Sequence, residues 1–179
     1  QLDPLGTSVT TACSYTPADK GYGIRAAIWA GAHLDAEPAP VLFDRGLVAP
    51  GVDAGYVDAP SAFGGKAFPG TVGQYNPGSQ PFLKVNRHGE RFMNESQEYD
   101  NASHASFQQP GHVYAMIHDA NYFEDVTRFH TIGCSAITRL VPGGMEKKLE
   151  QYAEEGLIMK ADTIEELADK MGFTGADKD

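Results

Sequence analysis

The sequence has few cysteines and no long apolar run. Its two cysteines, Cys13 and Cys134, lie far apart and belong to no CxxC pair. A disulfide framework or a zinc knuckle is therefore not indicated, and we expect both to be ordinary buried thiols. Because no run of about 18 apolar residues occurs in the chain, we also expect no membrane insertion.

Basic residues are scarce as well. The chain has 14 Lys and Arg against 24 Asp and Glu, which gives a net charge of −10. A protein that binds nucleic-acid phosphates or an anionic membrane needs the opposite sign, so we expect no nucleic-acid partner. The 179 residues, with 41% hydrophobic and 21% charged, suit one globular domain or part of a larger one. Because the first residue is Gln1, we expect the chain to belong to a longer protein.

Several motifs that commonly mark catalytic or cofactor sites are absent. The sequence contains no GxGxxG, GxxxxGK[ST], HExxH or GxSxG, so a nucleotide cofactor would have to be held mainly by another domain. His112 and His118 have the even spacing that puts two side chains on one face of a strand. No third ligand follows at a recognisable spacing, so we predict no metal site.

Short strands interleaved with helices predict an α+β fold with a small sheet flanked by helices. A β-hairpin is predicted over 81–95, because Asn86 and Gly89 suit the positions of a tight turn between two short strands. The other predicted elements are helices over 23–34, 98–107, 120–129, 145–155 and 163–172, and strands over 112–119 and 157–160.

Two helices carry clear signals at their ends, and the first helix carries a packing signal. Gly156 stands where a C-terminal glycine would end the helix over 145–155. Thr163 and Glu166 form a T-x-x-E capping box, and Gly172 stands at the other end of that helix. The small residues over 23–34 predict a helix that packs closely against another backbone.

A long irregular Gly/Pro-rich stretch separates the first helix from the hairpin. Residues 36–81 hold 8 Gly and 7 Pro, with aromatic residues scattered at no regular period. The aromatic residues argue against disorder, and loops of this length inside a domain are often functional. We expect the stretch to lie over a neighbouring domain or a ligand pocket. A long wrap over the protein's own surface is an equally open alternative.

Three segments in order resemble one protein family. Residues 85–99, VNRHGERFMNESQEY, resemble the V-N-x-x-G-x-R-F-x-N-E segment of the capping domain in fumarate reductase/succinate dehydrogenase-like flavoproteins, which include urocanate reductases and 3-ketosteroid dehydrogenases. Residues 21–35, GYGIRAAIWAGAHLD, resemble the family's G-D-G-I-x-x-A-x-x-A-G-A helix at the edge of the FAD domain. Residues 156–172, GLIMKADTIEELADKMG, resemble its later strand and helix.

The resemblance implies a two-part flavoenzyme. Residues 1–35 would be an edge of the FAD-binding domain, and 36–179 a capping and substrate domain that is incomplete at its C-terminus. The implied partners are a small-molecule substrate, an unidentified electron donor, and the FAD-binding domain of the same protein, which would hold most of the FAD. Gly21 and Gly23 would lie near the cofactor, with Tyr22 where the family commonly has Asp. The resemblance is compatible with a cytoplasmic or an exported bacterial enzyme.

The sequence departs from the fumarate reductases at one catalytic position. Those enzymes carry a proton-donating arginine eight residues after the first arginine of the motif, and counting from Arg91 leads here to Tyr99. Their proton-relay Glu and Arg are absent from 75–80, YNPGSQ. With Ser96, Tyr99 resembles the tyrosine of 3-ketosteroid dehydrogenases, which exchanges a proton with a substrate carbon while flavin N5 exchanges the hydride. A phenol, with an ordinary pKa of about 10, can protonate a developing enolate without adding buried charge.

These arguments give a set of site predictions. Tyr99 is the predicted catalytic residue. The predicted positioning residues are Arg91, Asn94, Glu95 and Ser96, and the predicted substrate-pocket residues are Tyr75, Ser79 and Gln80. The expected substrate is an α,β-unsaturated carbonyl compound, a quinone or a steroid-like molecule, and the isolated fragment is expected to be inactive. The alternatives are a fumarate- or urocanate-type reductase with another proton donor, and a non-enzymatic interaction module whose aromatic stretch docks on a partner.

Overall fold

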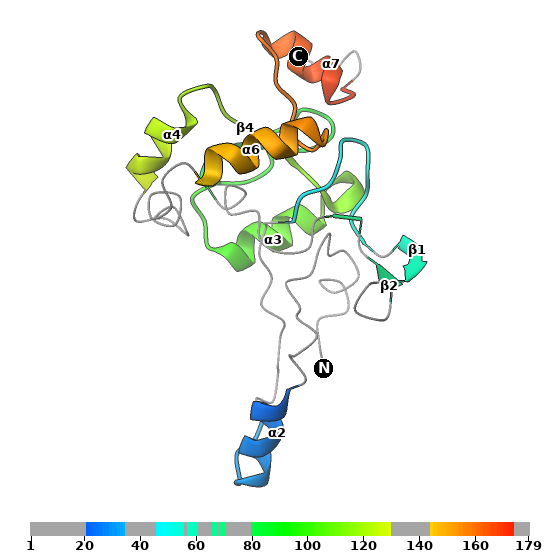
Figure 1. Ribbon diagram of the computed structural model, residues 1–179, viewed down its shortest axis with the longest axis vertical. Helices are drawn as coiled ribbons and strands as arrows, with labels where there is room; N and C mark the ends of the chain where they lie inside the picture. The colour runs from blue at the N-terminus through cyan, green and yellow to red at the C-terminus, as the bar shows by residue number, and fades with distance from the viewer. Residues whose placement is uncertain are drawn as a thin grey trace.

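The structure is a computed structural model that describes residues 21–34, 46–55, 57–60, 66–67, 69–70, 80–129 and 144–173. These residues form an α+β fold with helices and two small antiparallel sheets (Figure 1), as the sequence predicts. Four residues that the sequence analysis singled out, Cys13, Tyr75, Ser79 and Cys134, lie outside the described residues.

Five of the predicted helices are present. They are α2 (Tyr22–Trp29), α3 (Tyr99–Phe107), α4 (Tyr122–Asp125) continued by the 3₁₀ helix η3 (Val126–Phe129), α6 (Gly144–Glu154) and α7 (Ile164–Lys170). Of the helices that the structure describes, none combines the length and the apolar composition needed to span a bilayer.

The sheet that carries the candidate site consists of β3 (Leu83–Val85) and β4 (Ala115–Ile117), paired antiparallel. The predicted hairpin is only partly correct. Its turn is present, but its second arm is not a strand, because only a single bridge joins Val85 to Arg91. After this bridge the chain turns toward α3, so a distant strand takes the place of the second hairpin arm. The strand predicted over 112–119 is shorter because it follows the 3₁₀ turn η2 (Pro110–His112).

The strand predicted over 157–160 is wrong, because the chain there closes the end of α6. Gly156 adopts a positive φ of 73°, and the backbone amides of Leu157 and Ile158 both donate to the carbonyl of Tyr152, at 2.8 and 3.1 Å. This hydrogen-bond pattern is a helix C-terminal motif that depends on the glycine. The amides of Leu157 and Ile158 are thus already engaged and do not pair with another strand.

The Gly/Pro-rich stretch (residues 36–81) is not wholly irregular, which corrects the sequence prediction. It contains β1 (Val57–Pro60) and β2 (Lys66–Ala67), paired antiparallel with a register shift. A pair this short is held by backbone hydrogen bonds and requires no alternating pattern of apolar side chains, so the sequence carries no clear signal for it.

Helix α2 stands apart from the other described elements (Figure 1) and has no buried residue. The close packing predicted for this helix is therefore wrong within this structure. Tyr22, Ile24 and Trp29 are 67%, 58% and 78% exposed. The small residues of α2 are suited to a close approach, but nothing in the described part of the chain covers its apolar side chains.

The core lies where β3 and the helices meet. Its buried apolar residues are Val85, Ala102, Tyr122, Val126 and Ala168. An aromatic cluster adjoins it, in which the ring of Phe82 lies 5.3 Å from that of Tyr122 and 5.2 Å from that of Phe129. Burial raises the pKa of the Tyr122 hydroxyl above its ordinary value. This core fixes the sheet from which the candidate site is built.

Candidate functional site

The candidate site begins with a tight turn after β3. Asn86 is buried, and its Oδ1 accepts hydrogen bonds from the backbone amides of His88 and Glu90 at 2.9 and 3.1 Å. Its Nδ2 donates to the Glu90 Oε2 at 3.0 Å and to the Gln109 Oε1 at 3.2 Å. Gly89 supplies the positive φ of 78° that the turn needs. One asparagine therefore fixes the turn and connects it to the end of α3.

A bidentate ion pair between Arg91 and Glu95 fixes the segment that follows the turn. The Arg91 Nε and Nη2 donate to the two carboxylate oxygens of Glu95 at 2.8 and 2.6 Å. Glu95 Oε1 also accepts from the backbone amide of Lys84 at 3.4 Å, which ties the segment to β3. The hydrogen bonds from Arg91 lower the pKa of Glu95 to about 2. The Glu95 side chain is 9% exposed and that of Arg91 is 61% exposed, so the carboxylate lies inside and the guanidinium forms its outer cover.

The chain then turns into α3 through Asn94. The Asn94 Oδ1 accepts from the backbone amide of Ser96 at 3.1 Å, and its carbonyl accepts from the amide of Gln97 at 3.2 Å. A side chain that bonds the amide two residues later is a common way for asparagine to start a turn. Asn94 and Ser96 are both exposed. Their role in the structure is to set the direction in which the helix begins.

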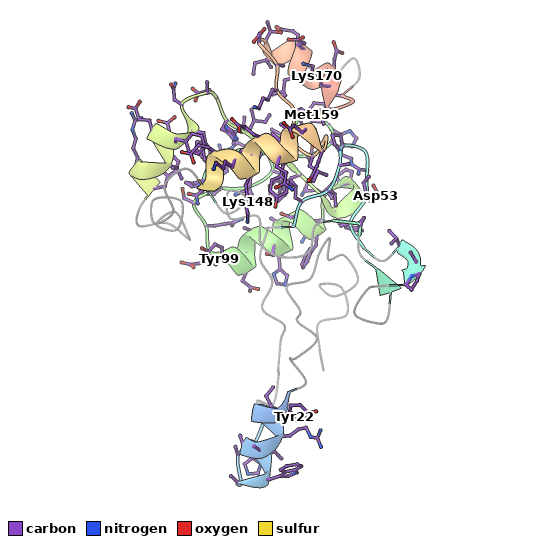
Figure 2. The ribbon with its side chains drawn as sticks, viewed as in Figure 1. Tyr22, Asp53, Tyr99, Lys148, Met159 and Lys170 are labelled. Carbon is purple, nitrogen blue, oxygen red and sulfur yellow. The ribbon has the colours of Figure 1, made fainter. Side chains whose placement is uncertain are left out.

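Tyr99 is the first residue of α3, after Glu98 in an extended conformation. Its side chain is half-buried, and Figure 2 places it at the N-terminal end of the helix. The residue thus retains some exposed surface instead of being enclosed in the core. A phenol in this position can exchange a proton with a molecule that approaches the end of α3.

The structure brings some of the predicted site residues together and leaves others apart. The four predicted positioning residues lie in the segment that leads directly to Tyr99. Gln80 is fully buried, and its carbonyl accepts a hydrogen bond from Lys84 Nζ at 3.0 Å. Gly21 and Gly23 belong to the start of α2, which lies well away from Tyr99 (Figure 2).

Lys84 is a buried residue that the sequence analysis missed. It is 1% exposed, whereas its neighbour Leu83 is 43% exposed, the reverse of what hydrophobicity predicts. The Nζ of Lys84 lies 5.6 Å from the centre of the Tyr114 ring, a cation–π distance. No local pattern could have revealed this, because Tyr114 comes from the segment that leads into β4.

His112 and His118 bond to backbone carbonyls and do not share a strand face, because His112 belongs to η2 and β4 covers only Ala115–Ile117. The ring Nδ1 of His112 donates to the Phe107 carbonyl at 2.5 Å, and that of His118 donates to the Asp119 carbonyl at 3.0 Å. Within the described ranges, no group of three or more His, Cys, Asp or Glu side chains could hold a metal ion.

Comparison with known proteins shows a similarity to an oxidoreductase. Over 91 residues, 51% of its length, the chain is 34% identical to a NADH:acrylate oxidoreductase of Vibrio harveyi. The chain matches only 8% of that relative's length. No known family profile matches the chain, and no solved structure matches it. The similarity supports a relationship with oxidoreductases.

Proposed function

We propose that the chain is the capping, substrate-binding part of an FAD-dependent oxidoreductase that interconverts a saturated and an α,β-unsaturated carbonyl compound. The observation that carries the proposal is Tyr99, half-buried at the start of α3 and preceded by the loop that Arg91 and Glu95 hold in place. The similarity to a NADH:acrylate oxidoreductase supports it, because acrylate contains a carbon–carbon double bond next to a carboxylate.

In the reductive direction, Tyr99 donates its phenolic proton to the carbon next to the carbonyl group. A bound FAD, once reduced by the electron donor, would supply the hydride for the neighbouring carbon. The hydrogen bond at Asn94 and the ion pair at Glu95 support the start of α3. This matters because a proton donor must stay within hydrogen-bond reach of the reacting carbon.

The residue at position 99 also bears on the substrate class. The Nε and Nη2 of Arg91 donate to Glu95, whereas the position of the fumarate reductase proton donor holds Tyr99. A dicarboxylate needs fixed positive charge, which arginine usually supplies. A phenol at position 99, where the fumarate reductases carry an arginine, therefore supports a neutral carbonyl compound or a monocarboxylate over a dicarboxylate such as fumarate.

The FAD would be held mainly by a domain outside this chain, with α2 at its edge. The start of α2 is open to its surroundings, because a Cβ atom added to Gly21 or Gly23 would meet no heavy atom within 4 Å. The exposed side chains of Ile24, Ile28 and Trp29 also support a covering domain. Apolar groups on one helix gain stability when they are removed from water.

Replacing Tyr99 tests the proposed proton transfer. In the full-length protein, Tyr99→Phe should lower turnover by roughly 10²–10⁴-fold, because a positioned proton donor contributes about that much. Flavin absorbance should be retained, since the phenol does not hold the cofactor. Tyr152→Phe is the matched control, because Tyr152 is also half-buried on a helix and is assigned no chemical role. Equal turnover in the wild type and Tyr99→Phe would remove Tyr99 from the mechanism.

A substrate comparison separates the proposal from its nearest rival. The full-length protein would be assayed with acrylate, a 3-ketosteroid enone and fumarate under the same conditions. Turnover of acrylate or the enone above that of fumarate is expected. Preferential turnover of fumarate would instead favour a dicarboxylate reductase with a different proton donor.

A further inference from the structure

Three segments that are distant in sequence meet beside the turn at Asn86. Arg87 Nη1, in this turn, forms an ion pair with Asp53 Oδ1. The backbone amide of Ala54, which follows Asp53, donates to the carbonyl of Gly111 at 2.9 Å. The described segment 46–55, part of the Gly/Pro-rich stretch, is thereby attached both to the turn after β3 and to η2.

Gly111 makes this meeting possible. Its φ is +70°, and a Cβ atom added to it would lie 2.6 Å from Arg87 Cζ, from Arg87 Nη1 and from Asp53 Oδ1. Such distances are well below van der Waals contact, so a side chain at this position would push both partners away. The ion pair lies directly over a glycine whose left-handed backbone disfavours a side chain.

Hydrogen bonds also connect the turn after β3 to α3, next to the place where segment 46–55 is attached. Asn86 Nδ2 donates to Gln109 Oε1 at 3.2 Å, and Gln109 Nε2 donates to the carbonyl of Ala105 in α3 at 3.0 Å. The turn, η2 and the C-terminal end of α3 thus form one hydrogen-bonded frame. Tyr99 occupies the opposite end of the same helix.

We propose that Asp53, Arg87 and Gly111 form a latch that fastens segment 46–55 to this frame and opens locally while β3 and β4 stay paired. The side chains of Asp53 and Arg87 are 64% and 31% exposed, so water and salt can reach the ion pair. The described polar contacts between segment 46–55 and the frame include an accessible ion pair and a backbone hydrogen bond, and contacts of this kind open more easily than a buried core. The latch therefore controls how segment 46–55 leaves the frame, whatever the chemical role of Tyr99.

Hydrogen exchange measured by mass spectrometry on the full chain tests the latch. Asp53→Asn should speed exchange in 52–55 by about two- to fivefold, as expected for loss of an accessible ion pair. Gly111→Ala should speed it by about tenfold or more, because it adds both a steric clash and an unfavourable backbone conformation. Exchange in 83–85 and 115–117, which form the β3–β4 ladder, should not change.

Two further variants keep the test decisive. Arg128→Gln is the matched control, because it removes an exposed guanidinium that pairs with Glu124 and Asp125 elsewhere in the fold. Exchanging the charges with Asp53→Arg and Arg87→Asp together should restore slow exchange in 52–55 relative to either single change. The latch is overturned if Asp53→Asn and Gly111→Ala resemble the control, or if the β3–β4 ladder opens to the same extent as 52–55.

Discussion

The ion pair between Arg91 and Glu95 controls the ionisation of a carboxylate that has little access to solvent. Hydrogen bonds from Arg91 hold the pKa of Glu95 at about 2, below its ordinary 4.5. A carboxylate with a lowered pKa in the folded state stabilises the fold fully at pH values above its unfolded pKa. This contribution is lost as the pH falls from about 4.5 toward 2. The loop before Tyr99 should therefore loosen in acid, and not near neutral pH.

Removal of the Arg91 guanidinium should raise the pKa of Glu95 again. In Arg91→Gln the pKa of Glu95 should rise from about 2 toward 4.5, because the largest cause of its lowering is gone. Carboxyl titration followed by NMR measures the change directly. Arg128→Gln, which alters an exposed ion pair on η3, should leave the pKa of Glu95 as it is. A Glu95 titration that does not move in Arg91→Gln would show that other groups keep the carboxylate ionised.

At the scale of single elements, α7 shows how much a local sequence signal can determine. Thr163 Oγ1 accepts a hydrogen bond from the backbone amide of Glu166 at 3.2 Å, as the capping box predicts. Glu166 Oε2 accepts from the amide of Asp162 at 3.1 Å, one residue earlier than the ideal motif. Gly172 follows the helix with a φ of 79°. Only Ala168 is buried in α7. The residues that cap the helix therefore contribute more to its stability than its packing does.

The cap of α7 can be tested on its own. Thr163→Ala should destabilise the helix by about 0.5–2 kcal/mol, because the amide of Glu166 loses its acceptor. Faster hydrogen exchange over 164–170 is the expected signature, and Thr163→Ser should retain most of the protection. If Thr163→Ala exchanges as slowly as the wild type, packing and not the cap would hold α7.

At the scale of the whole molecule, α2 stands apart with its apolar side chains exposed. Trp29, the one tryptophan in the sequence, is 78% exposed. Arg25 lies 5.4 Å from its ring centre, which covers only part of the indole. A helix this short is marginally stable by itself in water. We therefore expect α2 to need a partner surface, which the proposed FAD-binding domain would supply.

The fluorescence of Trp29 can report on that surface. In the 179-residue chain alone, its emission should resemble that of an indole in water and should be readily quenched by a neutral quencher. In the full-length protein, emission from a variant that keeps Trp29 as its only tryptophan should shift to shorter wavelength and resist quenching. Equal quenching in both proteins would contradict the proposed domain contact.

Signals that act within a few neighbouring residues determined much of this protein from its sequence. The helix ends at Thr163 and Gly156, the turn at Asn86 and the helix after Glu98 all follow from backbone and side-chain preferences that span fewer than about five residues. The segment around Arg91 was singled out through its resemblance to flavoprotein capping domains. The hydrogen bonds between Arg91 and Glu95 connect residues four apart, whereas the one from Lys84 to Glu95 connects residues eleven apart.

Only the tertiary structure decided the pairings between distant segments. The strand that pairs with β3 is β4, not the second arm of the hairpin, because backbone hydrogen bonding in a sheet does not depend on distance along the chain. Lys84 is buried beneath Tyr114, and Asp53 reaches Arg87 over Gly111. These contacts depend on the position of each segment after folding, which the preferences of neighbouring residues do not encode.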